Sequence, residues 1–201
     1  MTRQLALPLQ APPAPTLDNF VPGSNSELLA RLRALAAGAA SESVIYLWGA
    51  RGCGRTHLLR ASERSGVSLA DDVQRLDADG QQALFNAINR VREVGGTVLA
   101  TGDAPPAQLA LREDLRSRLG WGLVYEVKPP TDEERALYVH GEAARRGLRL
   151  GDDVVAYLLT HVRRDLSSLG ALLEHLDRVS LEARRPVTLP LVREAIRVRT
   201  P

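Results

Sequence analysis

The sequence predicts an α/β fold followed by a small all-helical domain. Four short apolar runs alternate with stretches in which apolar residues recur at helical spacing, and this alternation is typical of a parallel sheet with both faces covered. The runs cover residues 44–48, 67–70, 97–101 and 123–127. After residue 130 only helical spacing remains. We therefore expect about four parallel strands in residues 16–129 and a helical domain in residues 130–201, with residues 1–15 as a flexible tail.

Composition indicates an ordinary globular protein. The 201 residues are 44% hydrophobic and 25% charged, as in a folded domain, and no apolar run approaches the ~20 residues that cross a membrane. The single cysteine, Cys53, excludes an internal disulfide and fits a reducing cytoplasm, where we expect the protein. The four histidines show no tight spacing, so we expect no structural zinc. A net charge of +2 is too weak to indicate nucleic-acid binding by itself.

The first fifteen residues predict an extended tail. Pro8 and Pro12 interrupt the apolar run QLALPL at residues 4–9, which argues against a signal peptide and against a core strand. Residues 11–15 (APPAP) favour a polyproline II spacer. Two interpretations follow: the hexamer is a segment held out for a partner, or the tail is disordered and its leucines are incidental.

Caps, breakers and spacing predict the elements of the α/β part. Ser24 or Asn25 can cap a first helix whose leucines recur at helical spacing. These are Leu28, Leu29, Leu32 and Leu35. Residues 44–48 (VIYLW) are β-branched and aromatic and stop at a glycine, as a strand buried on both faces does. The glycine pair at residues 95–96 ends the helix that precedes the third strand.

The C-terminal part begins with a capping signal. Thr131 followed three residues later by Glu134 is a capping box, which marks the start of a helix. Three or four helices are expected from there, at roughly residues 131–146, 152–162, 165–183 and 189–198.

The most specific motif is the glycine-rich segment GARGCGRT at residues 49–56. It follows a strand and opens a helix, the context that the phosphate-binding loop G-x-x-x-x-G-K-[ST] requires. Its backbone N–H groups would surround phosphate oxygens, and Thr56 would offer its hydroxyl to Mg²⁺. Arg55 stands where the pattern has lysine, and a planar guanidinium is not equivalent to a compact ammonium there. The alternative is a plain glycine-rich connection between strand and helix.

Polar residues follow two of the predicted strands. Asp71 and Asp72 come after the second run, as a Walker B pair does, so that Asp71 would join Thr56 at Mg²⁺ and the second carboxylate would orient a water. The alternative is a pair of acids that cap the next helix. Thr101 and Asp103 end the next strand and would lie beside a γ-phosphate.

Two arginines in the segment LRSRLGWGL are candidate arginine fingers. Such a residue, Arg116 or Arg118 here, stabilises charge on a neighbour's nucleotide during hydrolysis. The alternative for either is a solvated surface charge, because all but one of the 26 Lys and Arg residues are arginine and only Lys128 is lysine.

These motifs, in this order, resemble the AAA+ module of the bacterial replication initiator DnaA. The matching segments are TLDNFVPGSN (16–25), GARGCGRTHLL (49–59), TGDAPP (101–106) and LRSRLGWGL (115–123). They correspond to the lead-in, Walker A, sensor 1 and box VII of that family. The resemblance implies a three-layer AAA+ P-loop module with a helical lid, and it aligns Arg118 with the arginine finger and Arg164 with the sensor 2 arginine.

The same resemblance implies a nucleotide site and assigns its residues. They are Gly49, Gly52, Gly54, Arg55, Thr56, His57 and Arg164, with Thr101 and Asp103 at sensor 1 and Asp71 and Asp72 as catalytic carboxylates. The bound cofactor would be ADP or ATP, with Mg²⁺ at Thr56 and Asp71.

Three further features resemble the Hda family, the regulatory inactivators of DnaA. The P-loop carries arginine, the sequence given stops after the lid without a helix-turn-helix domain, and QLALPL is similar to a sliding-clamp binding motif. The resemblance implies a negative regulator of replication initiation that docks on the DNA polymerase sliding clamp and presents Arg118 to ATP-bound DnaA. DNA would be reached indirectly through the clamp, and a homodimer is a further expectation. The clamp-binding residues would be Gln4, Leu5, Leu7, Pro8 and Leu9.

One departure from the family is substantial. Residues 57–70 leave room for a helix and little else, where the family has another strand, so we expect that strand to be missing. This departure and Arg55 leave intrinsic hydrolysis uncertain. Two alternatives stay open: an independent AAA+ ATPase that acts as a loader or remodeller, and a scaffold that coats DNA.

Overall fold

The computed structural model describes residues 14–39, 42–162, 165–183 and 185–199. The described chain forms two compact units, Ala14–Pro129 and a helical unit that runs from Pro130 onward. No helix in the described ranges is long and apolar enough to cross a membrane.

The first unit contains a four-stranded parallel sheet. Its strands are β1 (Val44–Trp48), β2 (Val67–Ala70), β3 (Thr97–Gly102) and β4 (Leu123–Glu126), in the order β2-β3-β1-β4. In the central strand β1, Ile45 lies opposite Leu99 of β3 and Leu123 of β4. The prediction of about four parallel strands is confirmed. Because β2 pairs with β3 alone within the described sheet, it forms an edge.

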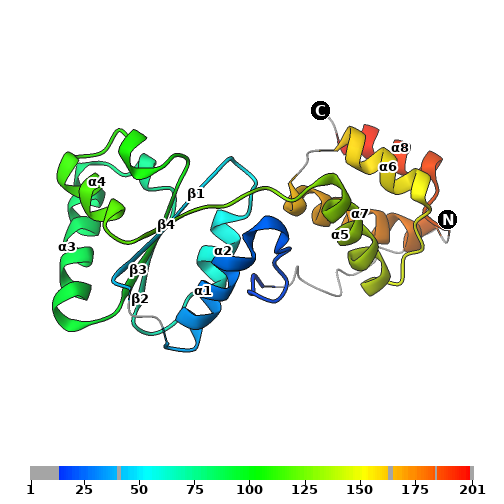
Figure 1. Cartoon of the computed structure of the whole chain (residues 1–201). Coiled ribbons are helices and arrows are strands. Elements are labelled where there is room, and N and C mark those ends of the chain that lie inside the picture. The colour runs from blue at the N-terminus through cyan, green and yellow to red at the C-terminus, as the bar shows by residue number, and fades with distance from the viewer. Residues whose placement is uncertain (1–13, 40–41, 163–164, 184, 200–201) are drawn as a thin grey trace. The chain divides into compact units, whose positions relative to one another are not determined.

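Helices cover both faces of this sheet. They are α1 (Ser26–Ala36), α2 (Arg55–Ala61), α3 (Ala78–Val94) and α4 (Glu113–Gly120), with short 3₁₀ turns η1 (Gly23–Asn25), η2 (Val73–Arg75) and η3 (Pro106–Gln108). Figure 1 shows α1 and α2 on one side of the strands and α3 and α4 on the other. The unit is therefore a three-layer sandwich.

Strand β1 illustrates how the sequence produces these layers. Successive side chains of a strand point to opposite faces. Ile45 and Leu47 accordingly join the core beneath α1 and α2, whereas Val44, Tyr46 and Trp48 join the core beneath α3 and α4. All but Trp48 are buried, and each such side chain contributes roughly 1.5–3 kcal/mol relative to an exposed one. A strand with two buried faces needs apolar residues at every position, which is the reason for its continuous run.

The prediction that Ser24 or Asn25 caps the first helix with its side chain is wrong. Asn25 stands at the N-cap of α1, but its side chain makes no cap hydrogen bond. Its Nδ2 donates to the carbonyl of Lys128 over 2.9 Å, and the Lys128 amide donates to Asn25 Oδ1 over 2.8 Å. These long-range bonds satisfy a buried side chain, so Asn25 ties the lead-in of the unit to the segment after β4. At the other end of α1, Arg64 Nη1 donates to the Leu35 carbonyl over 2.6 Å.

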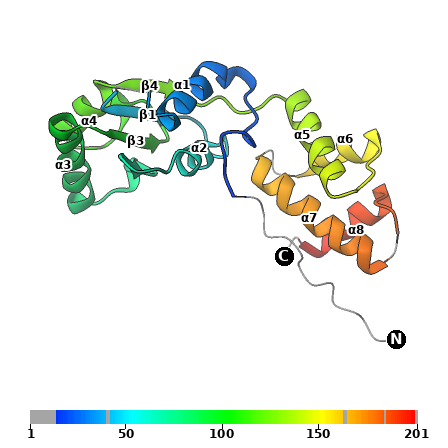
Figure 2. The same cartoon turned by 90° about the horizontal axis from the view of Figure 1, so that it is seen from below.

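The second unit is a bundle of four helices in its described part. They are α5 (Asp132–Arg145), α6 (Asp152–His161), α7 (Leu166–Ala183) and α8 (Leu189–Arg199), gathered together in Figure 2. Each begins and ends close to its predicted bounds. The capping box is present: Glu134 donates its amide to Thr131 Oγ1 over 3.2 Å, and the Thr131 amide donates to Glu134 Oε2 over 2.8 Å. The core side chains include Val139, Leu158, Leu173 and Val192.

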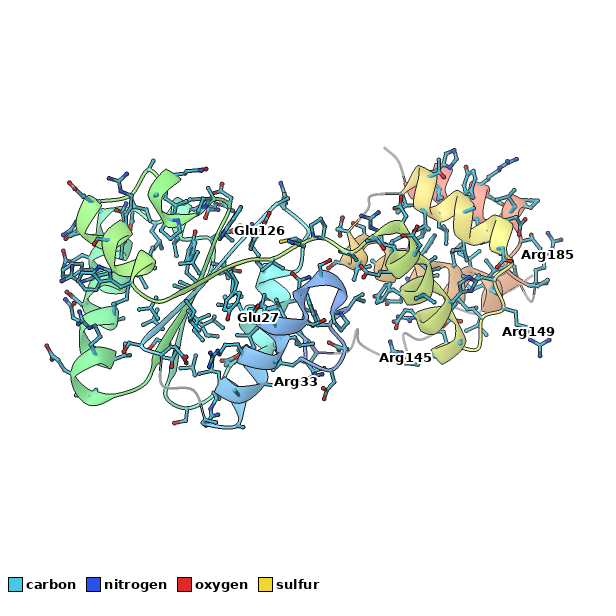
Figure 3. The ribbon with its side chains drawn as sticks, in the orientation of Figure 1. Glu27, Arg33, Glu126, Arg145, Arg149 and Arg185 are labelled. Atoms are coloured by element: carbon cyan, nitrogen blue, oxygen red, sulfur yellow. The ribbon has the colours of Figure 1, made fainter. Side chains whose placement is uncertain are left out.

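An ion cluster lies on α5 of this bundle. Arg145 Nη2 donates to Glu142 over 2.5 Å, and Arg146 Nη1 donates to the same carboxylate. Burial alone raises the pKa of Glu142, but the hydrogen bonds from these two arginines outweigh it and hold the pKa below its ordinary value. Arg145 is labelled on α5 in Figure 3.

Candidate functional site

The loop between β1 and α2 has the tight backbone of a phosphate-binding loop. A Cβ on Gly49 would lie 2.6 Å from the Val127 carbonyl, and a Cβ on Gly54 would lie 2.7 Å from the Phe20 ring. Gly54 also has a φ of 104°, which favours glycine. Cys53 is buried beneath the loop and belongs to the core on the α1 and α2 side, and this burial raises the pKa of its thiol. The loop is thus fixed by contacts that exclude side chains at its glycines.

The lead-in segment packs against this loop. The rings of Phe20 and His57 lie 5.7 Å apart, and His57 Nε2 forms a 2.9 Å hydrogen bond with the Thr16 carbonyl. His57, a predicted nucleotide residue, therefore joins α2 to the lead-in. Sequence reasoning assigned no site role to Phe20 or Thr16, although both lie within the matched segment 16–25.

Arg55 points along the carboxyl edge of the sheet. Only 9% of the residue is exposed. Its Nη1 donates to the Gly102 carbonyl at the end of β3, and its Nη2 lies 3.4 Å from Asp72 Oδ1. The guanidinium thus joins the first turn of α2 to the ends of two strands, by one hydrogen bond to a carbonyl and one ion pair.

The predicted acidic pair lies at the same edge and is also engaged. Thr101 Oγ1 donates to Asp71 Oδ1 over 2.5 Å and accepts the Asp72 amide over 2.9 Å. Asp72 is the non-glycine residue with a positive φ, 48°, among the described residues, a conformation that costs free energy and is commonest at functional sites. It precedes η2 without capping it, so the helix-cap alternative receives no support. The structure brings Asp71, Asp72 and Thr101 together at this edge.

Tyr46 supports this edge from below. Its hydroxyl donates to the Ala104 carbonyl over 2.8 Å, and a Cβ on Gly102 would lie 1.9 Å from the same hydroxyl oxygen. Burial, and next the charge of Asp103, raises the pKa of Tyr46 well above its ordinary value. Tyr46 therefore stays protonated and donates its hydrogen bond. Asp103 itself is exposed.

A second cluster lies on α3 and α4, around the predicted arginine finger. The guanidinium carbon of Arg118 lies 3.9 Å from the centre of the Phe85 ring and 5.3 Å from that of Trp121. Arg118 Nε also donates to Asn89 Oδ1 over 2.8 Å. The side chain is half-buried, and Trp121 beside it is 59% exposed. Its Nη1 donates to the Asp114 carbonyl over 3.4 Å, so Arg118 is held at the surface by two aromatic rings, one side-chain amide and one main-chain carbonyl.

Arginine and aromatic side chains alternate across this surface. Arg92 lies 4.9 Å from the Trp121 ring and Arg112 lies 5.6 Å from the Phe85 ring, on either side of Arg118. Sequence reasoning missed Phe85, Asn89 and Trp121. The signal available was spacing, because Phe85 and Asn89 are four residues apart on one helix and so lie on one face. Arg116, the other candidate finger, is half-buried on α4.

Comparison with known proteins finds a family match for the helical unit and a shared fold for the chain as a whole. Residues 132–196 match the family model described as "Hda, lid domain". Domain III of the *Thermotoga maritima* replication initiation protein DnaA is similar over 93% of this chain and 97% of its own, with a TM-score of 0.78 and 21% identity. Residues 132–196 therefore match the Hda lid, and the chain shares the fold of DnaA domain III.

Other solved structures share the same fold. DnaA from *Aquifex aeolicus*, with AMPPCP bound, has a TM-score of 0.69 and 20% identity, and the match covers 81% of this chain and 65% of that one. The *T. maritima* RuvB Holliday junction branch migration motor has a TM-score of 0.71 and 18% identity over 92% of this chain and 72% of its own. At these identities the likeness concerns the fold alone.

The loop fits a nucleotide better than the edge fits Mg²⁺. The loop has the left-handed glycines of a phosphate-binding loop, and Arg55 begins the helix that follows it. Mg²⁺ in a P-loop is held by the loop hydroxyl and the Walker B carboxylate. Here Asp71 is bound to Thr101, not to Thr56, and Asp72 is paired with Arg55. This donor set does not fit the predicted Mg²⁺ site.

Two parts of the predicted site lie outside the described residues. One is Arg164, the residue aligned with sensor 2. The other is the predicted clamp-binding set, Gln4, Leu5, Leu7, Pro8 and Leu9.

Proposed function

We propose that this chain is a nucleotide-binding negative regulator of replication initiation that promotes ATP hydrolysis by DnaA. The observation that carries the proposal is the pairing of an Hda lid at residues 132–196 with a DnaA-like AAA+ unit whose Arg118 lies at the surface. The family match indicates regulation, and the surface arginine supplies the chemistry. A cytoplasmic location is part of the proposal.

Nucleotide binding is proposed for the loop between β1 and α2. The glycines Gly49, Gly52 and Gly54 would surround phosphates, and Thr56 and Arg164 would add contacts. ADP or ATP is the proposed ligand. Support comes from the loop geometry and from the AMPPCP-bound structures of DnaA that share the fold.

Arg118 is proposed to act on a neighbour's nucleotide. An arginine finger is worth ~10³–10⁵ in hydrolysis rate, so a protein without hydrolysis of its own can still switch its partner. Contacts between a guanidinium and exposed rings are worth about 0.5–1 kcal/mol each. A phosphate offers charge-assisted hydrogen bonds of about 1.5–3 kcal/mol. Two such bonds to a partner's phosphate would offset the ring contacts and the hydrogen bonds to Asn89 and Asp114 that Arg118 gives up.

The N-terminal tail is proposed to bind the sliding clamp through Gln4–Leu9. A short segment binds weakly alone, but a clamp loaded on DNA raises the local concentration of everything tethered to it. The proline-rich sequence at residues 11–15 is proposed to act as a spacer between the tail and the first unit. Contact with DNA would then be indirect, and a homodimer is proposed as a further assembly.

The test is hydrolysis of DnaA-bound ATP in the presence of DNA-loaded clamp. Arg118→Ala is expected to lower the stimulated rate by about 10³. Its matched control is Arg33→Ala, because Arg33 projects from α1 on the opposite side of the sheet (Figure 3). Equal stimulation by Arg118→Ala and the parent protein would refute the finger, and undiminished stimulation after removal of residues 1–10 would refute the tether.

An independent ATPase is the less favoured alternative. A Walker B carboxylate that orients a water must be available to accept its proton. Asp72 is instead paired with Arg55 and Asp71 accepts from Thr101. Steady-state turnover by the isolated chain at typical enzyme rates would favour this alternative.

A further inference from the structure

We propose that Arg55 takes the place of Mg²⁺ in the nucleotide site, so that this chain binds nucleotide without a metal. The inference rests on the proposed nucleotide binding and goes beyond it. It starts from the disagreement between the P-loop pattern, which calls for Mg²⁺ between a hydroxyl and a carboxylate, and the contacts made at the edge of this sheet.

The first step is the bridging geometry of Arg55. In a P-loop site the metal links a carboxylate of the protein to oxygens of the phosphates. A guanidinium has five N–H donors in a rigid fork. Arg55 uses Nη1 for the Gly102 carbonyl and Nη2 for Asp72. Its remaining N–H groups belong to the residue that directly precedes Thr56 in the phosphate loop. Arg55 can therefore bind a carboxylate and a phosphate at once, which is the linking role of the metal.

The second step concerns the ligands that Mg²⁺ would need. Mg²⁺ requires near-octahedral oxygen ligands and is usually held by one or two carboxylates and the phosphates. Asp71 Oδ1 is 2.5 Å from Thr101 Oγ1, so its orientation is fixed by the end of β3. The carboxylate of Asp72 pairs with Arg55, and its main-chain amide donates to the same Thr101 hydroxyl. Both carboxylates are thus oriented by protein partners, and neither is joined to Thr56.

The third step is the rigidity of the Arg55 position. The Gly102 carbonyl cannot move away easily, since a single added Cβ there would collide with Tyr46, and Tyr46 is itself bonded to Ala104. Lysine would not reproduce the arrangement, because a point charge on a flexible stem cannot hold a carbonyl, a carboxylate and a phosphate in one plane. The arginine is therefore the residue on which metal-free binding depends.

The experiment is equilibrium binding of a fluorescent ADP analogue to the full chain, in excess Mg²⁺ and again in EDTA. The parent protein is expected to give dissociation constants that agree within about twofold, a difference well below the tenfold that 1.4 kcal/mol produces. In Arg55→Lys, Asp72 is released to a metal, and Mg²⁺ is expected to tighten binding by about tenfold or more. Arg60→Lys, an exposed residue on the same helix, is the matched control and should behave as the parent does.

A second variant keeps the test independent of Arg55. Thr56→Val removes the hydroxyl that would ligate Mg²⁺, and the inference predicts the same change in affinity with and without the metal. A loss confined to the Mg²⁺ condition would overturn it, as would weakening of the parent by about tenfold or more in EDTA. No binding in either condition would refute the nucleotide site itself, whereas strongly metal-dependent binding would refute this inference alone.

Discussion

Arg55 and Arg118 lie in the same unit, but the protein holds the two guanidinium groups by different kinds of contact. Arg55 is 9% exposed and is bound to a main-chain carbonyl and a carboxylate. Arg118 is half-buried and rests on the rings of Phe85 and Trp121, with hydrogen bonds to Asn89 Oδ1 and, over 3.4 Å, to the Asp114 carbonyl. The first set of contacts is strongly directional, whereas the ring contacts in the second are not.

The difference indicates which arginine can change partners. Removing Arg55 from its place leaves a buried carbonyl and a carboxylate without their donor, a penalty of about 1–3 kcal/mol or more. Removing Arg118 exposes two rings, one of which is already largely in solvent. Arg55 is therefore fixed in its own site, whereas Arg118 can leave its contacts for a partner.

The largest expected loss of stability comes from a change at Gly102, whose carbonyl accepts the hydrogen bond from Arg55. In Gly102→Ala the new Cβ would lie 1.9 Å from the Tyr46 hydroxyl oxygen, so the end of β3 must shift. Overpacking of this kind costs about 1–3 kcal/mol. Chemical denaturation should show the loss, and nucleotide affinity should fall with it, because the carbonyl that holds Arg55 moves. Gly120→Ala, with open space around its Cβ, is the control and should change stability by under about 0.5 kcal/mol.

The direct comparison of the two arginines comes next. Arg55→Ala is expected to lower the free energy of unfolding by about 2 kcal/mol, and Arg118→Ala by about 1 kcal/mol or less. Denaturant titration of both variants measures the difference. Equal losses would contradict the distinction between a built-in and an exchangeable arginine.

In the helical unit, Arg145 and Arg146 both bond to Glu142. The pH dependence of the free energy of unfolding tests these charged contacts. The pKa of Glu142 is held below its ordinary value, so its ion pairs stabilise the folded state above the ordinary pKa of a glutamate. That contribution is lost as the pH falls through the lowered pKa. Glu142→Gln should therefore cost about 1 kcal/mol at neutral pH and nothing at strongly acidic pH. A pH-independent cost in denaturant titrations would show that packing, not charge, accounts for the effect.

The smallest effect on stability is expected at Asn89. Asn89→Ala removes the 2.8 Å hydrogen bond to Arg118, which is only partly buried, and should cost about 0.5 kcal/mol. Because this bond orients the guanidinium, stimulation of DnaA should fall by about tenfold, and the dissociation constant for ADP should not change. Asn86→Ala, an exposed residue on the same helix, is the control. A variant as active as the parent would show that Arg118 needs no such orientation.

Local pattern was sufficient to predict the layers of the fold. The continuous apolar run at residues 44–48 follows from a strand buried on two faces, and the shortness of residues 57–70 predicts the reduced sheet. The capping box at Thr131 is local as well, since both of its bonds join residues three apart.

Contacts between distant segments could not be predicted in the same way. Asn25 is a residue type that commonly caps helices. Its side chain instead bonds to Lys128, because its amide group satisfies the main-chain N–H and C=O of Lys128 at once. The ring of Phe85 beneath Arg118 depends on how α3 and α4 pack, and no spacing within either segment encodes it. The motif predicted that Arg55 lies at the phosphate loop, but not that it would pair with Asp72.

The most direct test of this account is single-turnover hydrolysis of ATP held by DnaA, measured beside ADP binding by the regulator itself, with DNA-loaded clamp present. The account predicts that Arg118→Ala loses about 10³ in the stimulated rate while its own ADP affinity stays that of the parent. Retained stimulation in this variant, or a parallel loss of ADP affinity, would contradict the assignment of Arg118 to a partner's nucleotide.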